Sequence, residues 1–304
     1  MGALSGKVVL VTGGGNGIGR DCALIAAQEG AKVVVNDLGG SLKGEDEGSA
    51  GPAETVAAEI RAAGGEALAN GASVTDDAAV QAMVQQAVDA WGRVDVLVNN
   101  AGILRDKTFA KMEMEDFRLV LDVHLMGAVY CTKAVWPLMQ AQKYGRVVMT
   151  TSSSGLYGNF GQANYGAAKM ALVGLMQTLS LEGAKSGIHV NCLAPTAATR
   201  MTEGLLSAEV YEALKPEAVV PAMLVLACQD APTRTILCAG AGTFEAAHIT
   251  LTHGAWIGVD ALATERLAEQ LAAVRDRAGE AVPQSGAAQG ANEIAKAMVG
   301  QRSG

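Results

Sequence analysis

Short runs of apolar, mostly β-branched residues alternate with longer helical patterns as far as Ala194. We predict strands over Lys7–Thr12, Lys32–Asn36, Val94–Val98, Arg146–Thr151 and Ile188–Ala194. We predict helices over Gly17–Glu29, Ala53–Ala63, Asp76–Trp91, Glu113–Gln142 and Gln162–Ala184. Continuous apolar strands between helices indicate a parallel sheet with helices on both faces. Right-handed crossovers then give an α/β, Rossmann-like doubly wound sheet.

The pattern weakens after Pro195. Helices are expected over Ser207–Leu214, Pro216–Cys228 and Thr264–Ala278. Two segments, Thr235–Gly240 and Ala247–Thr252, each have the composition of a strand, and the pattern does not decide which one joins the sheet edge. The stretch Glu280–Ala291 is rich in Gly, Ala, Ser and Gln and predicts a loose tail. We therefore expect one domain over residues 1–258 and a C-terminal helical extension or tail over 259–304.

The composition excludes several classes of protein. Half of the 304 residues are hydrophobic, which is too many for a disordered chain. The net charge is −8, from 23 basic and 31 acidic residues, so the chain lacks the electrostatic footprint of a protein that binds nucleic-acid phosphates. Aromatic residues make up only 4%, which argues against stacking platforms for single strands.

Membrane, disulfide and metal signals are weak. The most apolar run, Met170–Leu181, lies between two charged residues and is shorter than the about 20 residues a spanning helix needs. The N-terminal run Val8–Val11 leads directly into glycines, as a strand does and a secretory signal does not. The 5 cysteines are widely spaced and contain no C-x-x-C. We expect a reduced, cytoplasmic protein without a metal site or a membrane partner.

A glycine-rich turn follows the first predicted strand and opens the first predicted helix. The spacing G-x-x-x-G-x-G differs from the common dinucleotide fingerprint G-x-G-x-x-G, but the physical requirement is shared. Glycines allow a tight turn and let backbone N–H groups approach a pyrophosphate at a helix N-terminus. The alternative is a turn of the same shape that binds nothing. The residues that we predict to hold the cofactor phosphates are Gly13, Gly15, Asn16, Gly17, Ile18 and Gly19.

Asp37 comes directly after the second predicted strand, 18 residues beyond Gly19. An acidic residue about 20 residues after the glycines accepts hydrogen bonds from the adenosine ribose in dinucleotide-binding folds. The same charge would repel a 2′-phosphate. We therefore predict NAD rather than NADP, against the alternative of a solvated loop aspartate.

Tyr165 and Lys169 are four residues apart in a helical pattern and therefore share a helix face. Ser152 lies at the end of a predicted strand, 13 residues before the tyrosine. A second Y-x-x-x-K pair, Tyr211 and Lys215, has no serine at the matching position and no strand before it. The spacing alone is thus weak, whereas a strand-end serine, tyrosine and lysine downstream of a glycine turn form a specific catalytic set.

Together with Asn99-Asn100-Ala101-Gly102, these motifs resemble the short-chain dehydrogenase/reductase family over about residues 5–230. The detail resembles one branch, the (3R)-hydroxyacyl-CoA dehydrogenase units of type 2 multifunctional enzymes, which are also hydroxysteroid dehydrogenases. The segments that carry this likeness are 36–40, 100–106, 158–165 and 200–202.

The resemblance implies a role for each motif. Tyr165 would be the general acid/base, Lys169 would favour its phenolate and hold the nicotinamide ribose, and Ser152 would bond the substrate oxygen. Further cofactor contacts implied on this basis come from Ser73 and Val74 at the adenine, Asn99, Ala101 and Gly102 at the adenosine ribose side, and Ala197, Ala198 and Thr199 at the nicotinamide.

His124 departs from the pattern of many family members, which carry a catalytic Asn at this place. Its imidazole would either serve the water relay to the lysine that the Asn serves, or be a buried side chain with its hydrogen bonds satisfied, and both interpretations stay open.

The predicted helix Gln162–Ala184 is nearly free of charge around its circumference, so it must be covered on most sides. Subunit packing is the usual family solution, which predicts a homodimer or homotetramer.

We therefore expect an NAD-dependent oxidoreductase of lipid metabolism that interconverts a secondary alcohol and a ketone. The expected substrate is a (3R)-hydroxyacyl-CoA, or a hydroxysteroid or its CoA-linked side chain. The enzymatic alternative is a 3-oxoacyl-thioester or small-ketone reductase. An alternative of another class is a non-catalytic NAD-binding sensor on the same fold.

Overall fold

The computed structural model describes residues 2–41, 43–44, 48–198 and 207–300. The chain divides into two compact units, Met1–Ala246 and Ala247–Gly304. The first unit ends before residue 258, where we expect the cofactor-binding domain to end. The domain boundary itself stays a prediction.

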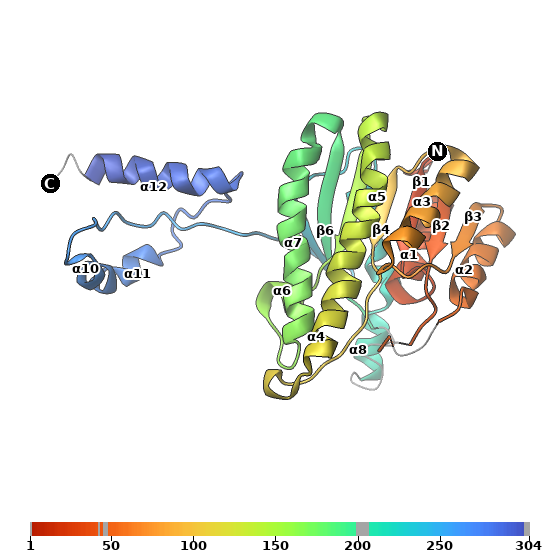
Figure 1. The fold of residues 1–304 in the computed structure, drawn as a ribbon, viewed down its shortest axis with the longest axis horizontal. Helices are drawn as coiled ribbons and strands as arrows, with labels where there is room; N and C mark the ends of the chain where they lie inside the picture. The colour runs from red at the N-terminus through yellow and green to blue at the C-terminus, as the bar shows by residue number, and fades with distance from the viewer. Residues whose placement is uncertain (1, 42, 45–47, 199–206, 301–304) are drawn as a thin grey trace. The chain divides into compact units, whose positions relative to one another are not determined.

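Strands and helices alternate through the first unit (Figure 1). The strands are β1 (Val8–Thr12), β2 (Lys32–Asn36), β3 (Glu66–Asn70), β4 (Val96–Asn99), β5 (Gly145–Thr150), β6 (Ile188–Thr196), β7 (Ile236–Gly240) and β8 (Thr243–Ala247). The α-helices are α1 (Gly17–Gln28), α2 (Gly51–Ala62), α3 (Asp77–Trp91), α4 (Met114–Leu121), α5 (Gly127–Gln142), α6 (Ser153–Tyr157), α7 (Ala163–Gly183), α8 (Ala208–Ala213), α9 (Val220–Ala227), α10 (Ala263–Glu269), α11 (Leu271–Val274) and α12 (Gly286–Gly300). Shorter segments are the 3₁₀ helices η1 (Phe109–Lys111), η3 (Ala184–Ser186) and η4 (Pro216–Ala218) and the π-helix η2 (Asp122–Met126).

The strands in the described residues form one eight-stranded sheet with the order β3-β2-β1-β4-β5-β6-β7-β8. The ladders from β3 to β7 are parallel. Strands β1, β4 and β5 are buried along their whole length, which explains their continuous apolar sequences. β7 and β8 are joined by Ala241 and Gly242, both with positive φ, as in a two-residue hairpin turn. The doubly wound α/β sheet predicted from the sequence is confirmed.

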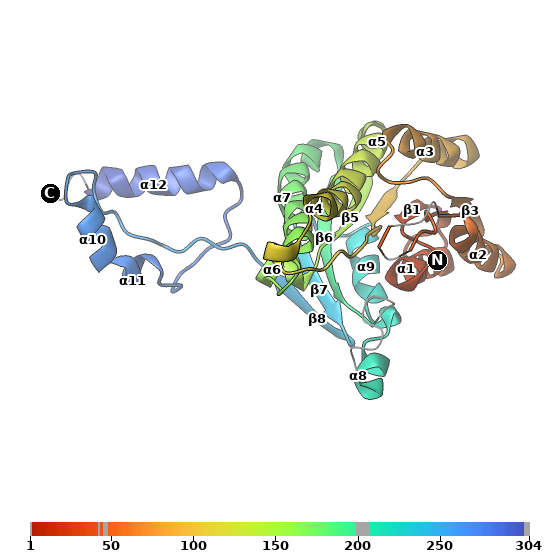
Figure 2. The same ribbon diagram turned by 60° about the horizontal axis from the view of Figure 1, so that its bottom comes forward.

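Helices cover both faces of the sheet. One face carries α1, α2 and α9, and the other carries α3, α4, α5 and α7 (Figure 2). The chain order reverses between the neighbouring strands β1 and β4, because β2 and β3 extend the sheet in one direction and β5 to β8 in the other. In open α/β sheets, ligands bind at the carboxyl ends of the strands at such a reversal. The predicted glycine turn and Asn99 both lie there.

The stretch Met114–Gln142 is long and apolar enough to cross a membrane by length and composition alone, with a mean hydropathy of 1.2. In the structure it comprises α4, η2 and α5, which pack on α3, α7 and the sheet strands β4 and β5. The apolar character of this helix therefore has a structural explanation in packing against the core.

The second unit consists of α10, α11 and α12 with the segments that join them. Leu251 and Ala281 form an isolated antiparallel bridge, with N–H to oxygen distances of 2.8 and 3.0 Å. The Trp256 ring lies against Gly300, where an added Cβ would come within 2.2 Å of the indole. The Arg266 guanidinium donates to the Ile257 carbonyl oxygen at 3.0 Å.

The structure corrects the sequence prediction at several elements. Strand β3, Glu-Ala-Leu-Ala-Asn, was not predicted because it holds no β-branched residue; it is defined by its ladder with β2. Of the two candidate strands, Thr235–Gly240 joins the sheet beside β6 as β7, whereas Ala247–Thr252 overlaps a strand only at Ala247, the last residue of β8. The tail predicted over Glu280–Ala291 is helical from Gly286 onward. The helix predicted over Thr264–Ala278 is divided into α10 and α11.

A buried carboxylate fixes the starts of β1 and β4, the two strands that carry the candidate site. Asp95 is fully buried and accepts the Val8 N–H at 2.9 Å and two Arg93 N–H groups at 2.8 and 2.7 Å.

Asp95→Ala leaves the Val8 N–H buried without its acceptor. We expect the free energy of unfolding in urea to fall by about 2–3 kcal/mol. The exposed Glu115→Gln should change it by less than about 0.5 kcal/mol, and an equal loss in both variants would contradict this role of Asp95.

Candidate active site

The glycine turn lies where backbone segments approach too closely for side chains. An added Cβ on Gly19 would lie 2.0 Å from the Gly13 carbonyl oxygen, and one on Gly13 would lie 2.8 Å from the Ala101 Cα. Gly13 also has a φ of 63°, a conformation that glycine adopts without strain. Asn16 directly precedes α1 in an extended conformation, so the free N–H groups at the start of that helix face the turn.

Asp37 is held in the same place by two backbone donors. Its Oδ2 accepts the Gly15 N–H at 2.8 Å, and its Oδ1 accepts the Gly39 N–H at 2.7 Å. A Cβ on Gly15 would meet this carboxylate at 2.7 Å and Pro52 at 2.6 Å. The carboxylate therefore lies next to the glycine turn with a fixed orientation, at the end of β2.

Two polar residues that we did not predict as site residues lock the turn to β4. The Thr12 hydroxyl accepts the N–H groups of Asn100 and Ala101 at 3.0 and 3.1 Å. The Asn100 side-chain amide donates to the carbonyls of Thr12 and Gly13 at 3.2 and 3.1 Å. Asn100 belongs to the motif Asn99-Asn100-Ala101-Gly102, whereas the only sequence signal of Thr12 is its position directly before Gly13 at the end of β1.

Ser152, Tyr165 and Lys169 come together at the carboxyl end of β5. Ser152 directly precedes α6, where its hydroxyl accepts the Ser154 N–H at 3.1 Å, and its side chain acts on Tyr165 by lowering the pKa of the phenol. The Lys169 Nζ lies 5.5 Å from the centre of the Tyr165 ring and donates to the Thr150 carbonyl at 2.6 Å. The arrangement is the one that the spacing along the chain predicts.

Burial controls the protonation of this set. It lowers the pKa of Lys169 from 10.5 to about 7, because the buried ammonium has lost its hydration. It raises the pKa of Tyr165, and the neighbouring Ser152 side chain acts in the opposite direction. The negative charge of Asp106 acts in the same direction as burial and raises the pKa of Tyr165 further.

His124 lies in η2, the π-helical segment between α4 and α5. Such segments are rare in proteins as a whole, and those that occur often lie at functional sites. The imidazole is 3% exposed and stands edge-on to the Tyr165 ring, with 5.2 Å between the ring centres. Its Nε2 lies 2.8 Å from the Ile103 carbonyl oxygen and 3.1 Å from the Ile103 nitrogen. Gly102 makes room for the ring, since a Cβ there would lie 2.3 Å from the imidazole Cε1.

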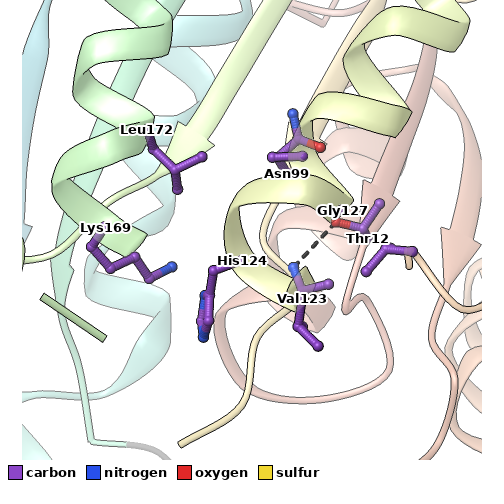
Figure 3. A pocket seen from close by; sticks show the side chains of 10 residues that line it. Thr12, Asn99, Val123, His124, Gly127, Lys169 and Leu172 are labelled. Atoms are coloured by element: carbon purple, nitrogen blue, oxygen red, sulfur yellow. Dashed lines mark hydrogen bonds between the residues drawn. The ribbon is translucent and has the colours of Figure 1, made fainter. Parts of the chain in front are cut away.

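A small cavity of about 10 Å³ separates His124 from Lys169 and Asn99 (Figure 3). Lys169 comes from α7, His124 from η2 and Asn99 from the end of β4. Val74 also lines the cavity, close to Gly127 at the start of α5. The cavity is thus lined by Val74, Asn99 and Ala101 from the predicted cofactor residues and by His124 and Lys169 from the predicted catalytic residues.

The segment 103–107 borders this region and is fixed on two sides. The Lys107 N–H donates to the Gly161 carbonyl at 3.0 Å, and the Asn164 amide donates to the Arg105 carbonyl at 3.0 Å. Both Arg105 and Lys107 form ion pairs with Asp116 of α4, at 2.7 and 3.0 Å. Lys107 and Arg105 hold the pKa of Asp116 below its ordinary value.

Other predicted residues lie farther from the catalytic set or are not described. The Ser73 hydroxyl pairs with Thr75 at 2.8 Å, and Ala198 is buried with its N–H donating to the Leu214 carbonyl at 2.6 Å. The Ile18 and Ala197 side chains pack on the apolar core. Thr199 and the motif 200–202 lie outside the described residues. Tyr211 is an exposed residue of α8 whose partner Lys215 pairs with Glu212, as expected for a surface helix.

Residues 7–209 match the protein-family model for short chain dehydrogenase. The chain belongs to the short-chain dehydrogenase/reductase family. A putative short-chain type dehydrogenase/reductase of Mycobacterium tuberculosis is 51% identical to it over 243 residues, covering 80% of this chain and 85% of that protein. This dehydrogenase is therefore an oxidoreductase that acts on an alcohol or a ketone with NAD(P).

The resemblance to type 2 multifunctional enzymes is also confirmed. Peroxisomal multifunctional enzyme type 2 of Drosophila melanogaster is 52% identical over 228 residues, or 74% of this chain, but only 38% of the enzyme is covered. The chain thus spans a little over a third of that relative. A solved 7α-hydroxysteroid dehydrogenase, complexed with NADH and 7-oxo glycochenodeoxycholic acid, aligns with a TM-score of 0.70 and 28% identity, covering 79% of this chain and 94% of that one.

The burial of Lys169 predicts a pH-dependent cost in stability. The pKa of Lys169 is about 7 in the folded dehydrogenase and 10.5 for the ordinary side chain. Between these two pH values the unfolded chain binds more protons than the folded protein, so the free energy of unfolding rises with pH. Burying the charged lysine therefore costs most stability below pH 7. Replacing Lys169 by Met removes that cost.

We expect Lys169→Met to raise the free energy of unfolding relative to the parent protein most near pH 6, and the difference to shrink towards pH 10. Loss of the bond to Thr150 adds an offset that does not depend on pH. Chemical denaturation of both proteins across this range measures the difference. Lys133→Met, at an exposed position of α5, is the control and should show no trend. A constant difference for Lys169→Met would contradict the prediction.

Proposed function

We propose that this dehydrogenase is NAD-dependent and oxidises a secondary alcohol to a ketone. The observation that carries the proposal is the convergence of Ser152, Tyr165 and Lys169 beside the glycine turn. The three side chains come from the end of β5 and from two turns of α7, and the Lys169 Nζ lies 5.5 Å from the centre of the Tyr165 ring. A base, a hydrogen-bond donor and a nearby cation are the groups that alcohol oxidation requires.

The residues at the turn fit a dinucleotide. The close backbone approaches at Gly13 and Gly19 build a tight turn at the N-terminus of α1, which supports the binding of a pyrophosphate there. The Asp37 carboxylate, fixed by the N–H groups of Gly15 and Gly39, favours the two free hydroxyls of an adenosine ribose. Its negative charge disfavours a 2′-phosphate, which supports NAD over NADP. Lys169 would hold the nicotinamide ribose.

The chain's own residues move one proton and hold one oxygen. Ser152 donates a hydrogen bond to the substrate oxygen and orients the alcohol toward Tyr165. The Tyr165 phenolate takes the hydroxyl proton, and the Lys169 ammonium stabilises that phenolate beforehand. When bound, NAD supplies the acceptor for the hydride that leaves the carbinol carbon. In the reverse direction Tyr165 returns the proton to the developing alkoxide.

We propose a (3R)-hydroxyacyl-CoA as the substrate, with a hydroxysteroid or its CoA-linked side chain as the second candidate. The segment between Ser152 and Tyr165 carries two strongly exposed rings, Tyr157 at 73% and Phe160 at 89%. In a chain with 4% aromatic residues, exposed rings beside the catalytic set favour a substrate with an apolar body. The likeness to multifunctional enzyme type 2 supports the acyl-CoA, and the likeness to the 7α-hydroxysteroid dehydrogenase supports the steroid.

Assembly and location are part of the same proposal. We propose a homodimer or homotetramer, because α7 exposes Met170 and Leu181 on a helix with little charge. The Drosophila relative is named as peroxisomal, so the cytoplasmic location expected from the sequence stays a prediction.

Removing the Tyr165 hydroxyl should abolish turnover without affecting NAD binding. We expect Tyr165→Phe to lower kcat by at least about a hundredfold, since general acid/base groups contribute factors of that size. NADH formation is followed by absorbance with (3R)-hydroxyacyl-CoA of several chain lengths, their (3S) isomers and steroid alcohols, and NAD binding by calorimetry. Tyr211→Phe is the matched control, since it alters the other Y-x-x-x-K pair and should leave kcat unchanged.

Several results would contradict the proposed function. Retained turnover in Tyr165→Phe would contradict the mechanism. Turnover of the parent only in the direction of ketone reduction would favour the reductase, and NAD binding without turnover of any alcohol or ketone would favour the sensor.

Removing the charge of Asp37 should reduce the preference for NAD over NADP. We expect Asp37→Ala to lower the ratio of kcat/KM for NAD to that for NADP by at least about tenfold. Asp37→Asn keeps the shape of the side chain while removing its charge, and it should move the ratio in the same direction. Asp77→Ala, on the exposed start of α3, is the control. An Asp37→Ala protein with the parent ratio would show that Asp37 does not select the cofactor.

A further inference from the structure

Three consecutive charged residues, Arg105, Asp106 and Lys107, lie in the segment that borders the catalytic set. Both cations pair with another carboxylate: Arg105 and Lys107 contact Asp116 of α4 at 2.7 and 3.0 Å. In the part of the chain that the structure describes, Asp106 itself forms no ion pair, although it lies between two cations in the sequence. Its side chain is exposed, so its negative charge has no counter-ion there.

One glutamine fixes the Asp106 carboxylate next to the catalytic tyrosine. Asp106 Oδ2 accepts the Gln162 Nε2–H at 2.7 Å, and Gln162 directly precedes α7. Tyr165 lies in the first turn of that helix. Gln162 Oε1 accepts hydrogen bonds from the Ser154 hydroxyl at 2.8 Å and from the Asn159 amide at 3.0 Å. Both polar ends of the Gln162 amide are therefore used, and the carboxylate is held beside the start of α7.

The charge of Asp106 acts on the reacting group. Burial raises the pKa of Tyr165 most, and the charge of Asp106 raises it further. The other titratable groups that face Tyr165 are His124 of η2, with 5.2 Å between the ring centres, and Lys169 of α7, with its Nζ 5.5 Å from the ring centre. A carboxylate in this place opposes proton abstraction, because it destabilises the phenolate. Its presence therefore calls for a reason other than the proton transfer.

We propose that Asp106 is a specificity-determining residue that excludes substrates with a negative charge close to the carbinol carbon. The inference rests on the proposed function and deepens it. A 3-hydroxyacyl thioester is neutral at its carbonyl group, whereas the free 3-hydroxy acid has a carboxylate two bonds from the carbinol carbon. With its hydroxyl on Tyr165, the acid would bring that carboxylate within reach of the charge that already acts on the phenol. The ring carbons of a hydroxysteroid are uncharged and avoid this repulsion.

The phosphates of coenzyme A are compatible with this selection. The pantetheine arm separates them from the carbinol, and exposed charges more than about 10 Å apart are largely screened at 0.1 M salt. Asp106 would therefore distinguish the thioester from the free acid.

The selection is tested with two substrates that differ in charge alone. They are the methyl ester and the free acid of the (3R)-hydroxyacyl chain that the parent oxidises best as its CoA thioester. We expect Asp106→Asn, which keeps an acceptor for Gln162, to lower the ratio of kcat/KM for the ester to that for the acid by at least about tenfold. Asp106→Glu keeps the charge and should stay closer to the parent ratio. Raising the salt to about 1 M should lower the parent ratio and leave that of Asp106→Asn unchanged.

A control and a pH profile separate charge from structure. Asp89→Asn is the matched control, because Asp89 also accepts a glutamine amide at 2.7 Å, from Gln85, but lies in the last turn of α3. It should leave the ratio unchanged. In Asp106→Asn the acid limb of kcat/KM for ester oxidation should move to lower pH, because the phenolate is no longer opposed by the carboxylate. A purely structural Asp106 would move neither the ratio nor the limb.

Binding tests the same selection without turnover. Calorimetry with NADH present, in which neither alcohol can be oxidised, should show that the parent binds the ester more tightly than the acid and that Asp106→Asn narrows this difference. A parent that binds or oxidises the acid as well as the ester would overturn the proposal, and so would an unchanged ratio in Asp106→Asn. Failure of the parent to oxidise any alcohol would instead contradict the proposed function, and the binding ratio would still decide the role of Asp106.

Discussion

The site depends on one constraint, the backbone-to-backbone contact between the turn after β1 and the turn after β4. Gly13 and Gly19 leave no Cβ between these segments, and the Asn100 amide then reaches the carbonyls of Thr12 and Gly13. The contact fixes where the N-terminus of α1 points and where Ala101 and Gly102 run. Gly102 in turn leaves the space that the His124 ring fills, so the cofactor turn and the catalytic cavity share a single frame.

Within that frame, the burial of Lys169 lowers stability and serves the proposed chemistry. Lys169 is buried between α7, β5 and β6, where its neighbours are a tyrosine, a histidine and a thiol and where no carboxylate of the described residues forms an ion pair with it. A buried cation without a counter-ion is costly in most folds. In the proposed mechanism this cost has a use, because a cation beside Tyr165 favours the phenolate that takes the substrate proton.

The sequence predicted the elements whose information is local. Each of these elements has its own local pattern: the β-branched strands, the glycine turn, Asp37, and the set of Ser152, Tyr165 and Lys169. The site residues among them lie at the carboxyl ends of the parallel strands. Strand β3 escaped prediction because the ladder with β2, rather than its own residues, makes it a strand. The π-helical segment at His124 has no periodic signature, and the contact of its imidazole with Gly102 joins residues 22 positions apart in the chain. The second unit exposes most of its residues, so its helices leave only a weak hydrophobic pattern.

The bonds around segment 103–107 bear on how specificity can change. Lys107 and Arg105 join this segment to Gly161, to Asn164 and to Asp116, so the two chain segments that flank the catalytic tyrosine are one cross-linked scaffold. A scaffold of this kind separates two kinds of mutation. Exposed side chains such as Tyr157 and Phe160 can be exchanged with little effect on the catalytic geometry, whereas loss of Asp116 would disturb every substrate alike. The fold can therefore acquire new substrates by single surface substitutions while its chemistry is inherited intact.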